Sequence, residues 1–120
     1  MKERIVQPKE ENEILTPEGC FILEISNSPL DEEVSITRTR VQPGVTTAFH
    51  RLRDTVERYV IIEGTGMVEV GSLPPSVVGP GDVVLIPAGT AQRIRNTGDR
   101  DLVFLCICTP RFRQEAYEEI

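Results

Sequence analysis

Three polar side chains, His50, Glu57 and Gln92, have the types and the spacing expected of a buried chemical site. His50 is the only histidine of the chain, and Glu57 follows it seven positions later, just before an apolar run that stops at Gly64. An imidazole and a carboxylate can hold a divalent cation, and they can also exchange protons with an organic molecule. Gln92 adds an amide that both donates and accepts hydrogen bonds. The residue types therefore indicate either a metal site or a polar pocket, and both interpretations stay open.

The alternation of side chains in strands explains how the first two of these residues can meet. Side chains two positions apart in a strand point to the same face, so His50 shares a face with Leu52, and Glu57 shares one with Tyr59. A polar turn at 53–55 separates the two segments. We expect this turn to fold the chain back as a β-hairpin that returns Glu57 opposite His50.

A second pair of strand segments carries Gln92. The run 83–87 is followed by the turn at 88–90 and then by 91–96, where alternation places Gln92 on one face with Ile94 and Asn96. If this hairpin and the first one line a single barrel, His50, Glu57 and Gln92 converge on one point inside it. Tyr59 lies on the same face as Glu57 and is expected to pack in the core with its hydroxyl at the pocket.

Strand signals dominate the chain, because glycine and proline interrupt short runs that are rich in Val, Ile and Thr. Many short strands at near-regular spacing predict an all-β, antiparallel sandwich or barrel. We expect an N-terminal arm at 1–13, the barrel at 14–110, and a short helix at 111–120 that packs on the barrel. The remaining expected strands are 20–26, 34–41, 67–70 and 102–109, with a short strand within 73–82 and a small edge strand at Ile5-Val6.

Composition excludes several classes of partner. The formal net charge is −6, which disfavours nucleic acid, because phosphate binding requires a basic face. No apolar run approaches the roughly 20 residues that span a membrane, and the first 13 residues lack the apolar core of a secretory signal. The three cysteines, Cys20, Cys106 and Cys108, lack the spacing of a zinc motif, so we expect reduced thiols in a cytoplasmic protein.

Two segments resemble the conserved motifs of one family. The stretch GVTTAFHRLRDTVERYVIIEG (44–64) resembles the first cupin motif, in which Gly44, His50, Glu57 and Gly64 fall in register. The stretch GDVVLIPAGTAQRIRN (81–96) resembles the second cupin motif, in which Gly81, Pro87, Gly89 and Asn96 fit. The resemblance implies an antiparallel double-stranded β-helix, also called a jelly-roll barrel, and it implies the homodimer that small cupins usually form.

The metal-ligand positions of the two motifs are incomplete. Metal-binding cupins usually supply three histidines and the glutamate, whereas Leu52 and Gln92 stand here at two of the histidine positions. The resemblance implies at most one divalent ion (Fe, Mn, Ni or Zn), held by His50, Glu57 and the amide of Gln92. In the alternative, His50 and Glu57 form a metal-free polar pocket, Gln92 and Tyr59 bind the ligand, and Leu52 narrows the pocket.

Three functions are compatible with these residues. The first is an enzyme that acts on a small polar or anionic molecule, with Glu57 and His50 as catalytic residues. The resemblance implies isomerase or cyclase chemistry, and less readily dioxygenase chemistry because the usual two-histidine set is broken. The second is a metal-free binding or sensor module without catalysis. The third is a structural protein with a vestigial site, which the three retained polar residues disfavour.

Overall fold

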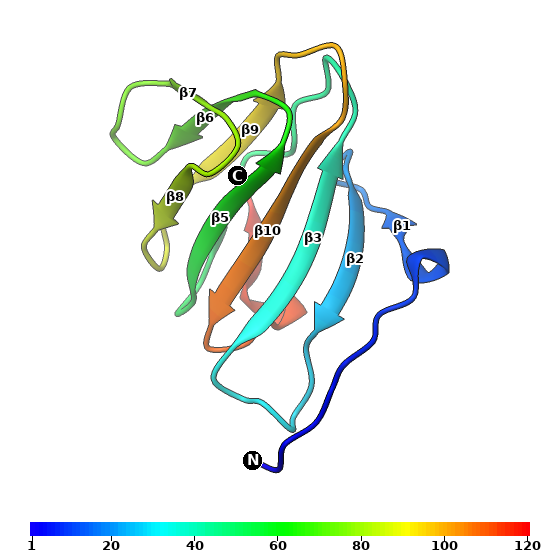
Figure 1. Cartoon of the computed structure of the whole chain (residues 1–120). Helices are drawn as coiled ribbons and strands as arrows, with labels where there is room; N and C mark the ends of the chain where they lie inside the picture. The colour runs from blue at the N-terminus through cyan, green and yellow to red at the C-terminus, as the bar shows by residue number, and fades with distance from the viewer.

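Two antiparallel β-sheets pack face to face in the computed structural model, which describes all 120 residues (Figure 1). The larger sheet has the order β1-β2-β3-β10-β5-β8, and the smaller has the order β11-β4-β9-β6-β7. This arrangement confirms the predicted all-β fold. The strands of the larger sheet are β1 (Ile14–Leu15), β2 (Phe21–Ser26), β3 (Ser35–Val41), β5 (Val56–Glu63), β8 (Val83–Ile86) and β10 (Leu102–Thr109). Those of the smaller sheet are β4 (His50–Leu52), β6 (Gly66–Val70), β7 (Ser76–Val78), β9 (Gln92–Asn96) and β11 (Tyr117–Glu119).

Strand β10 shows why the sequence forms this sheet. Its residues alternate strictly between buried and half-buried, which is the pattern of a strand that has one face in the core. It pairs with β3 on one side and with β5 on the other, in antiparallel register along nearly its whole length. The inward face of β10, which includes Phe104 and Cys106, therefore lies at the centre of the larger sheet.

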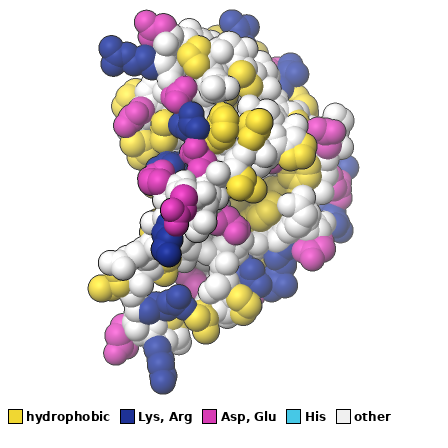
Figure 2. Space-filling view, turned by 90° about the vertical axis from the view of Figure 1, so that its right-hand side faces the viewer, with side chains coloured by type: hydrophobic (Ala, Val, Ile, Leu, Met, Phe, Trp, Pro, Cys, Tyr) yellow, Lys and Arg dark blue, Asp and Glu magenta, His cyan; other side chains and the backbone are white.

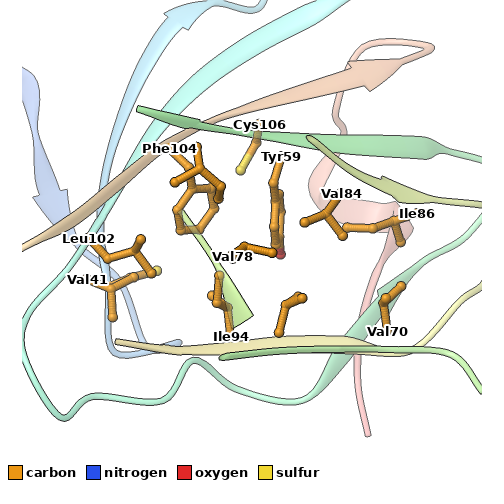
Figure 3. Packing of buried hydrophobic residues seen from close by; sticks show 13 residues of the cluster. Val41, Tyr59, Val70, Val78, Val84, Ile86, Ile94, Leu102, Phe104 and Cys106 are labelled. Carbon is orange, nitrogen blue, oxygen red and sulfur yellow. The ribbon is translucent and has the colours of Figure 1, made fainter. Parts of the chain in front are cut away.

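The hydrophobic core fills one part of the space between the sheets (Figure 3). Phe104 and Ile61 come from the larger sheet and Ile94 from the smaller one, and all three are almost completely buried. Gly66 on β6 lies so close to its neighbours that a Cβ atom there would stand 2.9 Å from Leu102 Cδ2 and 3.1 Å from the Arg95 carbonyl oxygen. The two layers are thus packed tightly at this end, and the room for a site lies at the other.

The two expected hairpins are corners between the sheets, and this corrects the sequence-based interpretation. Strand β4 pairs with β9 and β11, whereas β5 pairs with β10 and β8. The turn at 53–55 contains Asp54 with a positive φ of 53°, and it carries the chain from one layer to the other. The segment from β8 to β9 makes the same crossing. His50 and Glu57 therefore lie on facing layers, and His50 is directly opposite Gln92 on the neighbouring strand.

The C-terminal helix is much shorter than the sequence indicates. Only Gln114–Ala116 forms a 3-10 turn, and the chain then continues as β11, which pairs with β4. Ten residues are too few for a stable helix on their own, and the unpaired edge of β4 offers backbone hydrogen bonds instead. At the N-terminus, Ile5-Val6 forms no strand; a 3-10 turn at Glu10–Asn12 precedes β1 at the edge of the larger sheet. The helical segments are two 3-10 turns of three residues each, and neither could span a membrane.

Candidate functional site

A cavity of about 780 Å³ lies between the two sheets, at the end that the core leaves open. Its volume is in the range of sites for small organic molecules. The face beside β1 is shown in Figure 2, where hydrophobic side chains gather around a hollow. Strands from both sheets and the segment 14–18 contribute to the lining, so the cavity depends on the full sandwich.

His50 lies on β4 with its ring on the cavity wall. The side chain is 7% exposed, and its ring stacks on Tyr117 of β11 with the centroids 5.0 Å apart. His50 Nδ1 lies 2.8 Å from the Ala48 carbonyl oxygen. A carbonyl only accepts hydrogen bonds, so Nδ1 carries the proton and Nε2 of the neutral ring keeps its lone pair. His50 is thus oriented to accept a hydrogen bond or a proton from a molecule in the cavity.

Glu57, Gln92 and Tyr59 form a hydrogen-bonded chain that joins the two sheets. The Tyr59 hydroxyl donates to Gln92 Oε1, and Gln92 Nε2 donates to Glu57 Oε1. Gln92 is completely buried and does not line the cavity, whereas Glu57 and Tyr59 do. The Tyr59 ring packs on Phe104 with centroids 4.5 Å apart. Gln92 therefore orients the Glu57 carboxyl from behind.

The surroundings of Glu57 favour its neutral form. Burial raises the pKa of this carboxyl, and the hydrogen bond from Gln92 opposes the rise only in part. Burial also raises the pKa of the Tyr59 hydroxyl well above its usual range, so Tyr59 acts as a hydrogen-bond donor. The second oxygen, Glu57 Oε2, has one weak contact, with Cys108 Sγ at 3.9 Å. A carboxyl with a raised pKa and a nearly free oxygen is suited to hold or move a proton.

Two residues of this site were missed by sequence reasoning. Glu18 lines the cavity and places Oε2 3.9 Å from His50 Nδ1. Burial raises the pKa of Glu18, while His50 acts in the opposite direction. Tyr117, in the segment 111–120 that was expected to be helical, lies on β11 and stacks on His50 instead. Neither position belongs to the recognised motifs, so only the pairing of β11 with β4 and the turn before Cys20 reveal them.

Leu52, the remaining expected site residue, and the three cysteines are all buried side chains. Leu52 is buried, lines the cavity, and pairs with Tyr117 across β4 and β11; its role in narrowing the pocket for a ligand stays a prediction. All three cysteines are buried and free. Burial raises the pKa of Cys20 to about 11 and that of Cys108 to about 12, so these thiols are protonated and poorly reactive at neutral pH.

The family model of the Cupin domain matches residues 37–108, more than half of the chain. The chain belongs to the cupin family. A curated relative, the uncharacterized protein MJ1618 of Methanocaldococcus jannaschii, is 29% identical over 106 residues, which cover 87% of this cupin and 84% of the relative. The predicted family and jelly-roll architecture are confirmed.

Solved structures show the same fold at low sequence identity. KdgF from a Halomonas species superposes with a TM-score of 0.79 at 15% identity, covering 95% of this cupin and 98% of that chain. Pac13, described as a nucleoside dehydratase, gives 0.79 at 14% identity, with coverage of 98% and 92%. Bacillus subtilis oxalate decarboxylase OxdC, which contains Mn(II) centres, gives a TM-score of 0.78 at 23% identity. The superposition covers 92% of this cupin but only 30% of that longer chain.

The predicted metal-ligand set does not form a metal site with the side chains as placed. No three His, Cys, Asp or Glu side chains are grouped so that they could hold a metal ion. The amide of Gln92 is engaged on both sides, because its oxygen accepts from Tyr59 and its nitrogen donates to Glu57. His50 and Glu57 remain as two donors, fewer than a stable transition-metal site uses. The residues present therefore do not fit the divalent ion that the resemblance implies, and the chemistry of this site depends on the chain's own side chains.

Proposed function

We propose that this cupin binds a small polar organic molecule in its cavity and transfers a proton on that molecule through Glu57 and His50, without a metal ion. The observation that carries the proposal is the orientation of Glu57. Its carboxyl is buried, has a raised pKa and accepts from Gln92 through one oxygen, and Glu57 lines the same cavity as His50.

The two groups have complementary roles. His50 Nε2 takes a proton from the bound molecule, since its lone pair is free, and the neutral Glu57 carboxyl gives a proton to another atom of that molecule. The substrate is thereby isomerised, or loses water if the protonated atom is a hydroxyl oxygen. Both groups return to their starting state by proton exchange with solvent. That Pac13, with the same fold, is described as a dehydratase supports a reaction of this type.

Deuterium exchange tests the proposal. Purified protein is treated with EDTA and incubated in D₂O with a set of small hydroxy-carbonyl compounds, amino-carbonyl compounds and sugars, and exchange at carbon is followed by NMR. We expect exchange to fall by about 10²–10⁴-fold in Glu57→Gln and in His50→Ala, while the surface variant Glu69→Gln keeps the wild-type rate. Exchange that survives in both site variants would contradict the assigned roles.

Elemental analysis of the same preparation tests the metal-free mechanism. We expect far less than one Fe, Mn, Ni or Zn ion per chain, and no change of metal content in His50→Ala. One ion per chain that disappears in His50→Ala and in Glu57→Ala would instead establish the metal site that the cupin motifs imply. Saturable binding without any exchange would favour the alternative function, a binding or sensor module.

We also propose that the molecule is a homodimer from a reducing, cytoplasmic compartment. Strand β1 is an edge strand, and Ile14 and Leu15 on it are 61% and 63% exposed, while Ile5 of the preceding arm is 86% exposed. Pairing with a second copy would cover this edge and these side chains. Light scattering at micromolar concentration is expected to give twice the 13.4 kDa mass of one chain; the mass of a single chain would contradict the dimer.

A further inference from the structure

We propose, on the basis of the function proposed above, that the ligand of this cavity is a small organic cation: a protonated amine that carries an apolar or aromatic group. The sequence alone indicates a small polar or anionic molecule and does not decide between the two. The charge, the free hydrogen-bonding atoms and the apolar lining of the cavity favour the amine.

The charged residues that line the cavity are nearly all acidic. Four carboxylates contribute to the wall, and no lysine or arginine does. The arginines that form ion pairs are bound to other acids outside this wall: Arg38, Arg40, Arg51, Arg53, Arg93, Arg111 and Arg113. His50 is the one lining residue able to carry a positive charge. An anionic ligand would therefore enter a negative cavity without a fixed cation to bind it, whereas an ammonium group would be attracted.

Two hydrogen-bond acceptors in the deep part of the cavity are largely free. His50 Nε2 has no partner, and Glu57 Oε2 has only the weak contact with Cys108. Both groups are more than nine-tenths buried, with exposures of 7% for the His50 side chain and 7% for Glu57. Two nearby hydroxyls have partners within the protein, because Thr39 contacts Cys106 Sγ and Thr47 accepts from the Ile94 amide. A ligand that donates N–H bonds complements these two acceptors.

The remaining wall suits the hydrocarbon part of an amine. Ile22, Leu52, Phe104 and Phe112 line the cavity together with the Tyr117 ring. Aromatic faces attract ammonium groups as well as covering apolar surface. Burial disfavours the charged form of Glu18 in the empty cavity, and a bound ammonium supplies the counter-charge that this carboxyl lacks, while Glu57 keeps the proton that the proposed reaction uses.

A matched set of probes tests the charge preference: benzylamine, benzyl alcohol and benzoate share one ring and differ in the head group. Because His50 is the only histidine, its imidazole resonances report binding at this site without assignment of the whole spectrum. We expect benzylamine to shift these resonances saturably and to bind about tenfold or more tightly than benzyl alcohol, with no binding of benzoate.

The outcomes separate the two proposals. Equal or tighter binding of benzyl alcohol or benzoate would overturn the cation while the cavity kept its role as a ligand site. Deuterium exchange at carbon without any binding of the three probes would overturn the cation alone, and the absence of both exchange and binding would overturn both proposals.

Two variants locate the effect. Glu18→Gln is expected to lower the affinity for benzylamine by about threefold to fivefold. The affinity for benzyl alcohol should stay unchanged, because the variant removes one charge from the wall with little change of shape. Glu69→Gln, on the outer surface and paired with Arg93, is the control and should leave both affinities unchanged. Equal weakening of both probes in Glu18→Gln would show a role in shape instead of charge, and would overturn the proposal.

Discussion

The acids on the outer face of the larger sheet and the acids in the cavity are the same residue types in opposite environments. Outside, Glu13 accepts from Arg40 at 2.6 Å and from Arg38 at 3.2 Å, and these hydrogen bonds lower its pKa. Inside, Glu57 is bonded to a neutral amide, and burial raises its pKa. The outer carboxylate stabilises the fold in its charged form, whereas the inner one is tolerated because it can stay protonated.

The polar groups of the cavity therefore serve a purpose other than stability. A charge that is buried without a partner of opposite sign costs free energy, and an arginine beside Glu57 would remove that cost. The chain has eleven arginines, and none lines the cavity. Buried acidic groups without a cation lower the stability of the empty protein, and a bound ligand can supply the partner that they lack.

The largest effect is expected from Gln92→Leu. This change leaves the Tyr59 hydroxyl and the Glu57 carboxyl buried without their shared partner, so it should lower the free energy of unfolding by about 2–5 kcal/mol. Tyr59→Phe, which leaves only Gln92 Oε1 unpaired, should cost less. Urea denaturation at pH 7 measures both. A Gln92→Leu protein as stable as the wild type would show that the chain of hydrogen bonds contributes nothing.

Glu57→Gln should change stability in the favourable direction. The folded-state pKa of Glu57 lies above its ordinary value of 4.5, so its contribution to stability is complete at acid pH and is lost as pH rises through the folded-state pKa. The variant cannot ionise, and we expect it to be more stable than the wild type by about 1–3 kcal/mol at pH 8. The advantage should disappear near pH 4. Denaturation curves across this pH range measure the difference in stability. An advantage of the variant that grows toward acid pH would contradict the prediction.

Glu13→Gln should have the opposite sign and a smaller size. The folded-state pKa of Glu13 is lowered from 4.5 by its hydrogen bonds with Arg40 and Arg38, so its contribution is present above that value and is lost as pH falls through the lowered pKa. We expect a loss of about 1 kcal/mol at pH 7 that shrinks at low pH and at high salt. A loss that grows at low pH would mean that the ion pairs are not its source.

The smallest effect is expected from Glu69→Gln. Glu69 pairs with Arg93 on the exposed side of the smaller sheet, with 36% and 41% of the two side chains exposed. Exposed pairs of this kind contribute little, because water and salt screen them. Differential scanning calorimetry should find no measurable change in Tm at physiological salt. A clear decrease in Tm would mean that this pair stabilises the fold as the ion pairs of Glu13 do.

Part of the site could be predicted because it depends on local alternation. The shared faces of His50 with Leu52 and of Glu57 with Tyr59 follow from the two-residue period of a strand, and their burial confirms them. The corner at 53–55 could not be distinguished from a hairpin, because a short polar turn fits both; only the choice of partner strands decides. That choice depends on contacts between segments distant in the chain, such as β10 with β3 and β5.

The roles of Gln92 and Glu18 could not be predicted from the sequence, for a related reason. Position 92 matches a ligand position of the family motif, and this spacing predicts a residue that faces the cavity. Whether an amide there faces a ligand or its neighbours depends on Tyr59, whose hydroxyl occupies the amide oxygen. Glu18 precedes the first long strand in a polar turn of ordinary composition, and its place beside His50 follows only from the folded position of that turn.

The hydrogen bonds of Gln92 join β9 of one sheet to β5 of the other, and this has a dynamic consequence. Any breathing motion that separates the layers must break the link that orients Glu57, so transient opening of the sandwich and loss of the competent site are one event. Amide hydrogen exchange in β9 and in β5 should therefore slow together when a ligand occupies the cavity, even where the ligand contacts neither backbone.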